Sequence, residues 1–284
     1  MGLGAIGLYL AQEFSLANYH VIGLDLRGNN TSQNLKTISI LNRKRFQLNL
    51  DIDSKIDKRD DIVIVTLKSY DIDEVLISKL VDSKKEVLFL QNGLLVQNKV
   101  QSMVQPFAVG TITGIQAKLE GKTIDVESQN TCIFAKLRDK NFKLAELAVK
   151  QNLLHTKLIF SSNTQIEFYE KYVRWVVICC LNIINSEGIG GSLVLTPKED
   201  ILMAIAELVS FIDCEFDLQV YSDDISNTMY NLPNNLITSS YSDFKQGKPT
   251  EILSELDYVI SKLKVFNQQH LMLERWRGEI INGR

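Results

Sequence analysis

Three glycines at the start of the chain, Gly2, Gly4 and Gly7, have the spacing G-x-G-x-x-G. In a βαβ unit the first glycine allows a tight turn, the second lets a pyrophosphate approach the backbone, and the third lets the helix pack closely on its strand. A helix beginning at Ala5 would direct free N–H groups and the positive end of its dipole at a phosphate group. The spacing therefore predicts a dinucleotide-binding fold. Because the sequence begins within the motif, we expect the first strand of the sheet to be truncated.

The residues after the glycine motif predict the next helix and strand of the same fold. A helix is expected over residues 5–17 and a buried parallel strand over residues 19–24. Asp25 and Arg27 follow that strand. An acidic residue at this position usually binds the ribose hydroxyls of NAD, whereas an arginine accommodates the extra phosphate of NADP. The pair leaves the choice of cofactor open, and a solvated loop is the alternative interpretation.

Two continuous apolar runs, at residues 61–67 and 87–90, predict central strands that are buried on both faces. Lys68 follows the first run, and Asn92 lies two residues after the second. Ligands in open α/β sheets bind beyond the carboxyl ends of the strands. These two side chains are therefore candidates for ligand binding, although an amide followed by glycine is also ordinary turn chemistry.

The rest of the chain changes from strand patterns to helix patterns. Alternating residues over 107–135 predict antiparallel strands, and residues 140–151 return to a helical pattern. Capping boxes that begin at Thr164 and Thr196, together with Pro249, mark three helix starts. No convincing strand pattern follows them. The second half of the chain is therefore expected to be helical.

Length and composition fit an ordinary two-domain protein of 284 residues with a net charge of −3. We predict an α/β fold: a Rossmann-type parallel sheet that binds the cofactor over residues 1–162, and an all-helical substrate-binding domain over residues 163–284. The charge offers no basic footprint for nucleic acid, and no apolar run approaches the roughly 20 residues that span a membrane. The four cysteines have neither metal-ligand nor disulfide spacing, which favours a cytoplasmic location and no bound metal.

Four motifs, taken together, resemble those of the ketopantoate reductase (2-dehydropantoate 2-reductase) family. They are the glycine motif, Leu67-Lys68-Ser69-Tyr70, Gln91-Asn92-Gly93, and Ser239-Ser240-x-x-Asp243-x-x-x-Gly247-x-x-Thr250-Glu251. The last motif is the most specific, and the set spans nearly the whole chain. The resemblance implies that NADPH reduces the ketone of ketopantoate in a cleft between a Rossmann domain and a helical domain.

The resemblance also implies a set of binding residues. The expected cofactor-binding residues are Gly2, Leu3, Gly4, Ala5, Ile6, Gly7, Arg27, Lys68, Asn92 and Glu251. The expected substrate-binding residues are Asn92, Asn182, Ser240 and Glu251. Within these sets, Arg27 would meet the 2′-phosphate of NADPH, and Glu251 would accept hydrogen bonds from substrate hydroxyls. A carboxylate in the first turn of a helix, such as Glu251, is also favoured by the helix dipole.

The chain departs from the family on the helix that carries the catalytic lysine. The family pattern of lysine, asparagine and asparagine at four-residue spacing corresponds here to Arg174, Ile178 and Asn182. Arginine is a poor proton donor because its pKa lies above about 12, although it can stabilise a developing alkoxide. Lys171 lies about 60° away around the helix and either reaches the same site or extends along the surface. The catalytic candidates are therefore Arg174, Lys171 and Lys68, and a lysine whose pKa is lowered by burial and by Arg174 would suit a general acid.

Three functions agree with these residues. The leading function is NADPH-dependent reduction of ketopantoate to pantoate, a step of pantothenate and coenzyme A biosynthesis. A related reductase of a different 2-oxoacid is the second, because Arg174 and Ile178 alter the substrate pocket. A catalytically degenerate NADP-binding relative is the third. The expected partner is a small-molecule 2-oxoacid, without nucleic acid or membrane, and the protein is expected to be a monomer or a homodimer.

Overall fold

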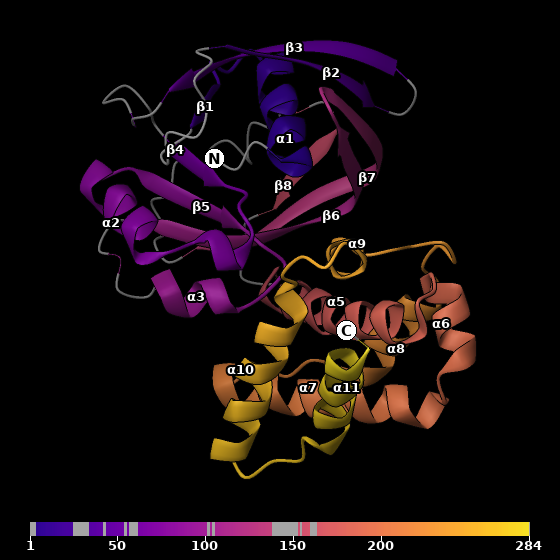
Figure 1. Ribbon diagram of the computed structural model, residues 1–284. Helices are drawn as coiled ribbons and strands as arrows, with labels where there is room; N and C mark the ends of the chain where they lie inside the picture. Colours follow the sequence, from indigo (N-terminus) through magenta and orange to yellow (C-terminus); the bar gives the residue numbers. More distant parts are fainter. Residues whose placement is uncertain are drawn as a thin grey trace. The chain divides into compact units, whose positions relative to one another are not determined.

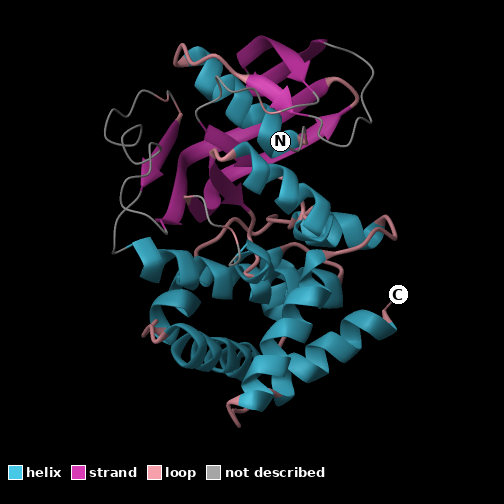
Figure 2. Cartoon of the chain, turned by 90° about the vertical axis from the view of Figure 1, so that its left-hand side faces the viewer, coloured by secondary structure: helices cyan, strands magenta, loops and turns pink. Residues whose placement is uncertain are grey.

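The computed structural model describes residues 4–24, 34–41, 44–53, 56, 62–100, 103, 106–137, 153, 155–159 and 164–283. The chain divides into two compact units. Unit 1 comprises Met1–Asn92 and Val96–Thr164, and unit 2 comprises Gly93–Leu95 and Gln165–Arg284. Within the described residues, unit 1 carries all the strands, and unit 2 is helical (Figures 1 and 2).

Unit 1 is built on one mixed sheet, with the order β1-β3-β2-β7-β6-β5-β4 and with β8 paired to β7. The strands are β1 (Ile22–Leu24), β2 (Asn34–Leu41), β3 (Lys44–Asp53), β4 (Ile62–Val65), β5 (Glu86–Leu90), β6 (Phe107–Glu120), β7 (Thr123–Leu137) and β8 (Thr156–Ile159). Only the pairs β2–β3 and β6–β7 are antiparallel among the described pairings. The parallel pairs β4–β5 and β5–β6 place the carboxyl ends of β4 and β5 at the same edge of the sheet.

The helix α1 (Ala5–Leu16) supplies much of the core of unit 1. All eight residues from Gly7 to Phe14 are buried, so the helix is covered on every side. Its leucines belong to a hydrophobic cluster that also includes side chains of β3, β4, β5, β6, β7 and β8, and the Tyr9 hydroxyl lies 2.8 Å from Oγ1 of Thr156. Burial of each large apolar side chain contributes about 1.5–3 kcal/mol. The helix that follows the glycine motif is therefore fixed firmly in place.

Local sequence explains two further elements of unit 1. The helix α2 (Glu74–Ser83) begins after Asp73, whose carboxylate accepts a 2.8 Å hydrogen bond from the backbone N–H of Leu76. The β6–β7 hairpin turns at Gly121, whose φ of +57° is the left-handed conformation that glycine adopts without strain. Two further short helices lie among the described residues of this unit: η1 (Ser69–Asp71) and most of α3 (Leu95–Val100).

Unit 2 is built from helices, of which α5 (Thr164–Asn185) is buried over most of its length. The other helices are α6 (Ile189–Leu195), α7 (Lys198–Phe216), α8 (Ser222–Tyr230), α9 (Ser239–Lys245), α10 (Glu251–Val265) and α11 (Leu271–Asn282). Among them, α7 packs against α8, α10 and α11. Aromatic rings of α5 and α7 contact one another. For example, the ring centroids of Tyr172 on α5 and Phe211 on α7 lie 6.5 Å apart. No single described helix is long and apolar enough to cross a membrane; one bent pair, α5 with α6, passes that test by length and composition alone.

The predicted fold class is confirmed, with a Rossmann-type sheet in the first part and helices in the second. Three strands, β2, β3 and β8, were not predicted, and the sheet is mixed because β2–β3 and β6–β7 are antiparallel hairpins. The helix predicted to start at the Thr196 capping box is present as α7, but the capping itself is wrong: Pro197 is the N-cap, and the Thr196 hydroxyl oxygen accepts from Asn185 Nδ2. The predicted helix over residues 140–151 and the strand before Gly2 lie outside the described residues.

Candidate functional site

The amino end of α1 carries the described half of the glycine motif. Gly4 is the exposed N-cap with an extended backbone, and its carbonyl oxygen accepts a 3.0 Å hydrogen bond from the N–H of Leu8. No side chain among the described residues caps this helix end, and an added Cβ at Gly4 would meet no atom within 4 Å. Ala5 and Ile6 are half-buried, and Gly7 is buried. This open helix end fits a phosphate group. Three other predicted cofactor-binding residues, Gly2, Leu3 and Arg27, lie outside the described residues.

Lys68 and Asn92 lie at the carboxyl ends of the neighbouring parallel strands β4 and β5. Between them, the side-chain amide of Gln91 donates 3.0 Å hydrogen bonds to the carbonyl oxygens of Val65 and Leu67. The side chain thus continues the β4–β5 pairing beyond the end of the backbone ladder. It fixes the backbone immediately before Lys68.

The turn after Lys68 is held by Lys99 of α3. Its ammonium group donates to the carbonyl oxygens of Ser69, at 2.7 Å, and of Ile72, at 3.0 Å. On the adjacent strand, Thr111 donates a 3.0 Å hydrogen bond to Oδ1 of Asn92. Sequence reasoning missed the roles of Gln91 and Lys99. Gln91 belongs to the Gln91-Asn92-Gly93 motif, but the carbonyl groups to which it donates, those of Val65 and Leu67, lie in and just after the separate strand β4.

The first half of α5 concentrates half-buried charges. Arg174 Nη1 lies 4.0 Å from Glu170 Oε2, one helical turn earlier. Burial lowers the pKa of the Arg174 guanidinium, and the neighbouring Glu170 opposes that effect. Burial likewise raises the pKa of Glu170, with Arg174 acting in the other direction. A carboxylate and a guanidinium therefore lie at the limit of ion-pair distance on the same helix as Lys171.

Lys171 is the side chain of α5 best suited to proton transfer. Burial, together with the positive charge of Arg174, lowers its pKa from 10.5 to about 7. This is the direction expected from its neighbours in the sequence. An ammonium group with a pKa near neutrality is an effective general acid, since it is both substantially protonated and willing to release its proton. Its assignment as the proton donor stays a prediction.

Asn182, near the end of α5, is fully buried and uses its side chain within unit 2. Its Nδ2 donates to the carbonyl oxygen of Glu187 at 2.9 Å and to that of Leu236 at 3.4 Å, and its Oδ1 accepts from the N–H of Thr238 at 3.0 Å. These bonds join the end of α5 to the segment that precedes α9. A substrate would have to replace one of them, and the substrate-binding role stays a prediction.

The other predicted residues of unit 2 lie on α9 and α10. Ser240 of α9 is buried, and its hydroxyl has no hydrogen-bond partner among the described residues. Thr250, the N-cap of α10, also has a buried hydroxyl without a hydrogen-bond partner among the described residues. Glu251 follows in the first turn of α10 and is also buried. Buried hydroxyls without partners suit a site that a polar ligand completes, because unpaired buried polar groups are otherwise costly.

Sequence reasoning missed one buried carboxylate, that of Glu255 on α10. The carboxylate accepts hydrogen bonds from the backbone N–H groups of Leu94 at 3.0 Å and Leu95 at 3.1 Å, and from the hydroxyl of Tyr172 at 3.2 Å. Burial raises its pKa to about 7, even though these hydrogen bonds act to lower it. No motif signalled this residue, because its backbone partners lie about 160 positions earlier in the chain.

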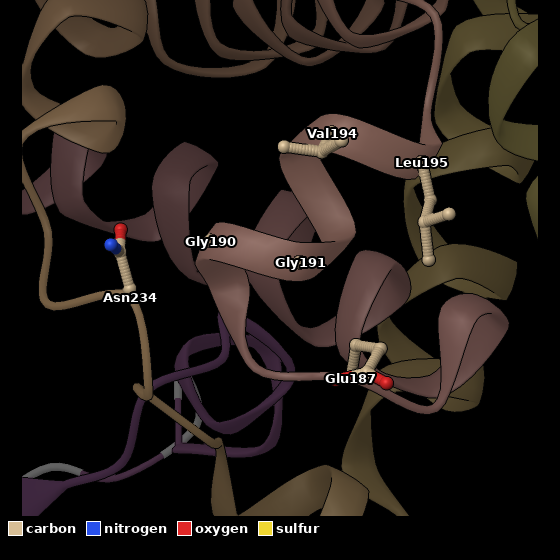
Figure 3. Close-up of a pocket in the computed structure, with 6 residues that line it drawn as sticks. All are labelled: Glu187, Gly190, Gly191, Val194, Leu195 and Asn234. Atoms are coloured by element: carbon tan, nitrogen blue, oxygen red, sulfur yellow. The ribbon is translucent and has the colours of Figure 1, made fainter.

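An open hollow of about 610 Å³ lies beside α6 in unit 2 (Figure 3). It is lined by Glu187, Gly190, Gly191, Val194, Leu195 and Asn234. The glycines allow close packing, since a Cβ added to Gly190 would lie 2.6 Å from Cβ of Asn234. None of the predicted site residues lines this hollow.

A family model decides which family the first part of the chain belongs to. Residues 1–139 match the model described as "Ketopantoate reductase PanE/ApbA". Residues 1–139 are a ketopantoate reductase PanE/ApbA domain. The match confirms the resemblance that the glycine, lysine and amide motifs indicated. No curated protein sequence matches the chain.

Solved structures extend the likeness of this PanE/ApbA-containing chain over its full length. D-mandelate dehydrogenase, solved with NADH and anilino(oxo)acetate, is 18% identical with a TM-score of 0.83, over 99% of this chain and 96% of that one. A probable 2-dehydropantoate 2-reductase from Bacillus subtilis is 18% identical with a TM-score of 0.75, over 100% and 98%. Dimeric ketopantoate reductase from Staphylococcus aureus is 15% identical with a TM-score of 0.74, also over 100% and 98%. At these identities the likeness concerns the fold.

Proposed function

We propose that this protein is an NADPH-dependent 2-oxoacid reductase, with ketopantoate as its leading substrate and pantothenate biosynthesis as its context. The observation that carries the proposal is the match of residues 1–139 to the PanE/ApbA family model. It is supported by Lys171 beside Arg174 on α5, where burial lowers the pKa of the lysine to about 7. Residues 1–162 bind the cofactor in this proposal, and residues 163–284 bind the substrate.

Each proposed residue has a defined task in the reaction. Bound NADPH would supply a hydride to the ketone carbon of the substrate. The ammonium group of Lys171 donates a proton to the developing oxyanion, and the Arg174 guanidinium stabilises that negative charge. Lys68 and Asn92 contact the reacting groups from the strand ends. The open helix end at Gly4 holds the pyrophosphate.

The remaining proposed contacts are to the 2′-phosphate of the cofactor and to the substrate. Arg27 binds the 2′-phosphate, for which its planar guanidinium is suited. Asn182, Ser240 and Glu251 bind the polar groups of the substrate. A ketopantoate reductase of S. aureus is named as dimeric, and a homodimer is therefore part of the proposal.

A second candidate is reduction of a different 2-oxoacid. Ile178 is buried and apolar at the position where the family carries an asparagine, so the helix offers less polar recognition than the family pattern. D-mandelate dehydrogenase is among the similar structures, and mandelate is a 2-hydroxy acid with an aromatic substituent. These two observations favour a substrate with a larger apolar group than ketopantoate.

One assay separates these candidates from a degenerate, cofactor-binding relative. Oxidation of NADPH is measured with ketopantoate, with phenylglyoxylate, and with a series of aliphatic 2-oxoacids. Turnover of ketopantoate with the highest kcat/KM supports the leading proposal, whereas preference for phenylglyoxylate supports the second. Binding of NADPH without oxidation in the presence of any of them would establish the degenerate relative and reject the reductase.

A further inference from the structure

Glu255 faces three hydrogen-bond donors and fixes a short segment of backbone. Two of the donors are the N–H groups of Leu94 and Leu95, at the amino end of α3, and the third is the hydroxyl of Tyr172. Glu255 is 0% exposed, and all these residues belong to unit 2. The ionised carboxylate accepts at both oxygens and satisfies all three donors, whereas protonation of one oxygen adds a donor and weakens that oxygen as an acceptor.

The segment and the carboxylate are closely fitted to each other at Gly93. A Cβ added to Gly93 would lie 1.9 Å from Oε1 of Glu255 and 2.5 Å from its Cδ. A side chain at this position would push the Glu255 carboxylate away from its present place, because backbone and carboxylate approach too closely for both. The contact places Gly93, directly after Asn92, against the buried face of α10.

We propose that Glu255 is a positioning residue for the reaction, which holds Asn92 in place by anchoring Gly93–Leu95. This inference rests on the proposed function, in which Asn92 contacts the reacting groups. Asn92 is fixed on one side by the hydrogen bond from Thr111 to its Oδ1. On the other side it is one peptide bond away from the anchored segment. Glu255 itself touches neither the substrate nor the cofactor in this proposal.

The anchor depends on the charge of Glu255. Burial raises its pKa to about 7, the negative charge of Glu251 adds to that rise, and the N–H groups of Leu95 and Leu94 and the Tyr172 hydroxyl oppose it. Tyr172, whose own pKa burial raises well above its ordinary value, stays a neutral donor. Below pH 7 protonation converts one carboxylate oxygen into a donor that faces other donors. The anchor is therefore complete above neutrality and weakened below it.

Unit 2 contains a matched control for this arrangement. Glu207 of α7 is also buried and accepts hydrogen bonds from two consecutive backbone N–H groups, those of Met272 at 3.0 Å and Leu273 at 2.9 Å. It caps α11 rather than the segment after Asn92. Glu207→Gln therefore reproduces the chemical change of Glu255→Gln without touching the proposed anchor.

The deciding experiment is a pH titration of the protein by NMR, without substrate. The backbone amides of Leu94 and Leu95 and the side-chain amide of Asn92 should shift together with a midpoint near 7. Glu255→Gln should abolish this common transition, and Glu207→Gln should retain it. The proposal is overturned if the wild-type resonances show no common transition, or if the transition persists in Glu255→Gln.

A kinetic measurement at pH about 8, where the carboxylate is ionised, then connects the anchor to turnover. Glu255→Gln should lower kcat about 10-fold or more, because small displacements of a reacting group are costly, while Glu207→Gln stays within about 2-fold of the wild type. Equal kcat values for the two variants would refute the positioning role. If the wild type reduces no 2-oxoacid, the proposed function fails, whereas the titration still decides whether Glu255 holds Asn92.

Discussion

The strand ends of unit 1 and the helix α5 of unit 2 present their candidate residues in different ways. The backbone around Lys68 is held by neutral carbonyl groups that accept from Gln91 and Lys99. On α5, by contrast, Lys171 lies among half-buried charges, and its pKa falls to about 7. The first arrangement fixes the backbone around Lys68 through hydrogen bonds to neutral carbonyl groups. The second makes a side chain reactive, so changes in the two regions should have different signatures.

The largest effect is expected from removal of the proton donor on α5. Lys171→Met should reduce the turnover of the preferred 2-oxoacid about 10²-fold or more, the usual scale of acid–base catalysis. Arg174→Lys should retain turnover, because it restores the family's residue and keeps the charge. The exposed Lys198, mutated to methionine, is the control. Full turnover in Lys171→Met would contradict the claim that α5 supplies the proton donor.

The next effect concerns the choice between the two nicotinamide cofactors. Arg27→Ala should lower the preference for NADPH over NADH by about 10-fold or more, because each charge-assisted hydrogen bond to the 2′-phosphate contributes about 1.5–3 kcal/mol. The measurement is kcat/KM with each cofactor at a fixed concentration of 2-oxoacid. An unchanged ratio would show that another residue recognises the phosphate.

A smaller effect is expected at the strand ends. Gln91→Met keeps the volume of the side chain but leaves the carbonyl oxygens of Val65 and Leu67 without its two hydrogen bonds. The free energy of unfolding should fall by about 1–3 kcal/mol, by the same amount at pH 6 and pH 8. Urea denaturation at the two pH values measures this loss. A loss that changes strongly with pH would contradict the contrast between the two regions.

The pH dependence of stability should report the buried charges of unit 2. The pKa of Glu255 rises from 4.5 to about 7 on folding, so the native state binds more protons in that range, and stability falls as pH rises from 4.5 to 7. The pKa of Lys171 falls from 10.5 to about 7, so stability rises as pH increases from 7 to 10.5. Each group gives a slope of at most about 1.4 kcal/mol per pH unit. Glu255→Gln should flatten the acidic limb, and Lys171→Met the alkaline limb, of the unfolding free energy.

Contacts close in sequence were predictable, whereas contacts across the fold were not. The low pKa of Lys171 follows from burial and from Arg174, three residues later on the same helix. The helix starts were similarly local, because Pro249 and the glycine motif act on the turns that follow them. The anchor at Glu255 joins residues 160 and 161 positions apart, and no periodic pattern encodes such a pair.

The strands show the same division. The buried runs that became β4 and β5 are continuous and apolar, which is typical of central parallel strands. β3 reads as alternating polar and apolar residues mixed with charges, and its place in the sheet depends on pairing with β1 and β2. Asn182 was identified from its spacing on α5, but its bonds to Glu187, Leu236 and Thr238 depend on how the helices pack.

The pH profile of the reduction tests the central claim most directly. NADPH oxidation with the preferred 2-oxoacid should be measured at saturating substrate for the wild type and for Lys171→Met. The general acid must be protonated, so kcat should fall as pH rises above about 7, the pKa of Lys171, and this decline should be absent from the residual activity of Lys171→Met. A wild-type kcat that rises through this range, or an identical decline in Lys171→Met, would contradict the assignment of Lys171 as the proton donor.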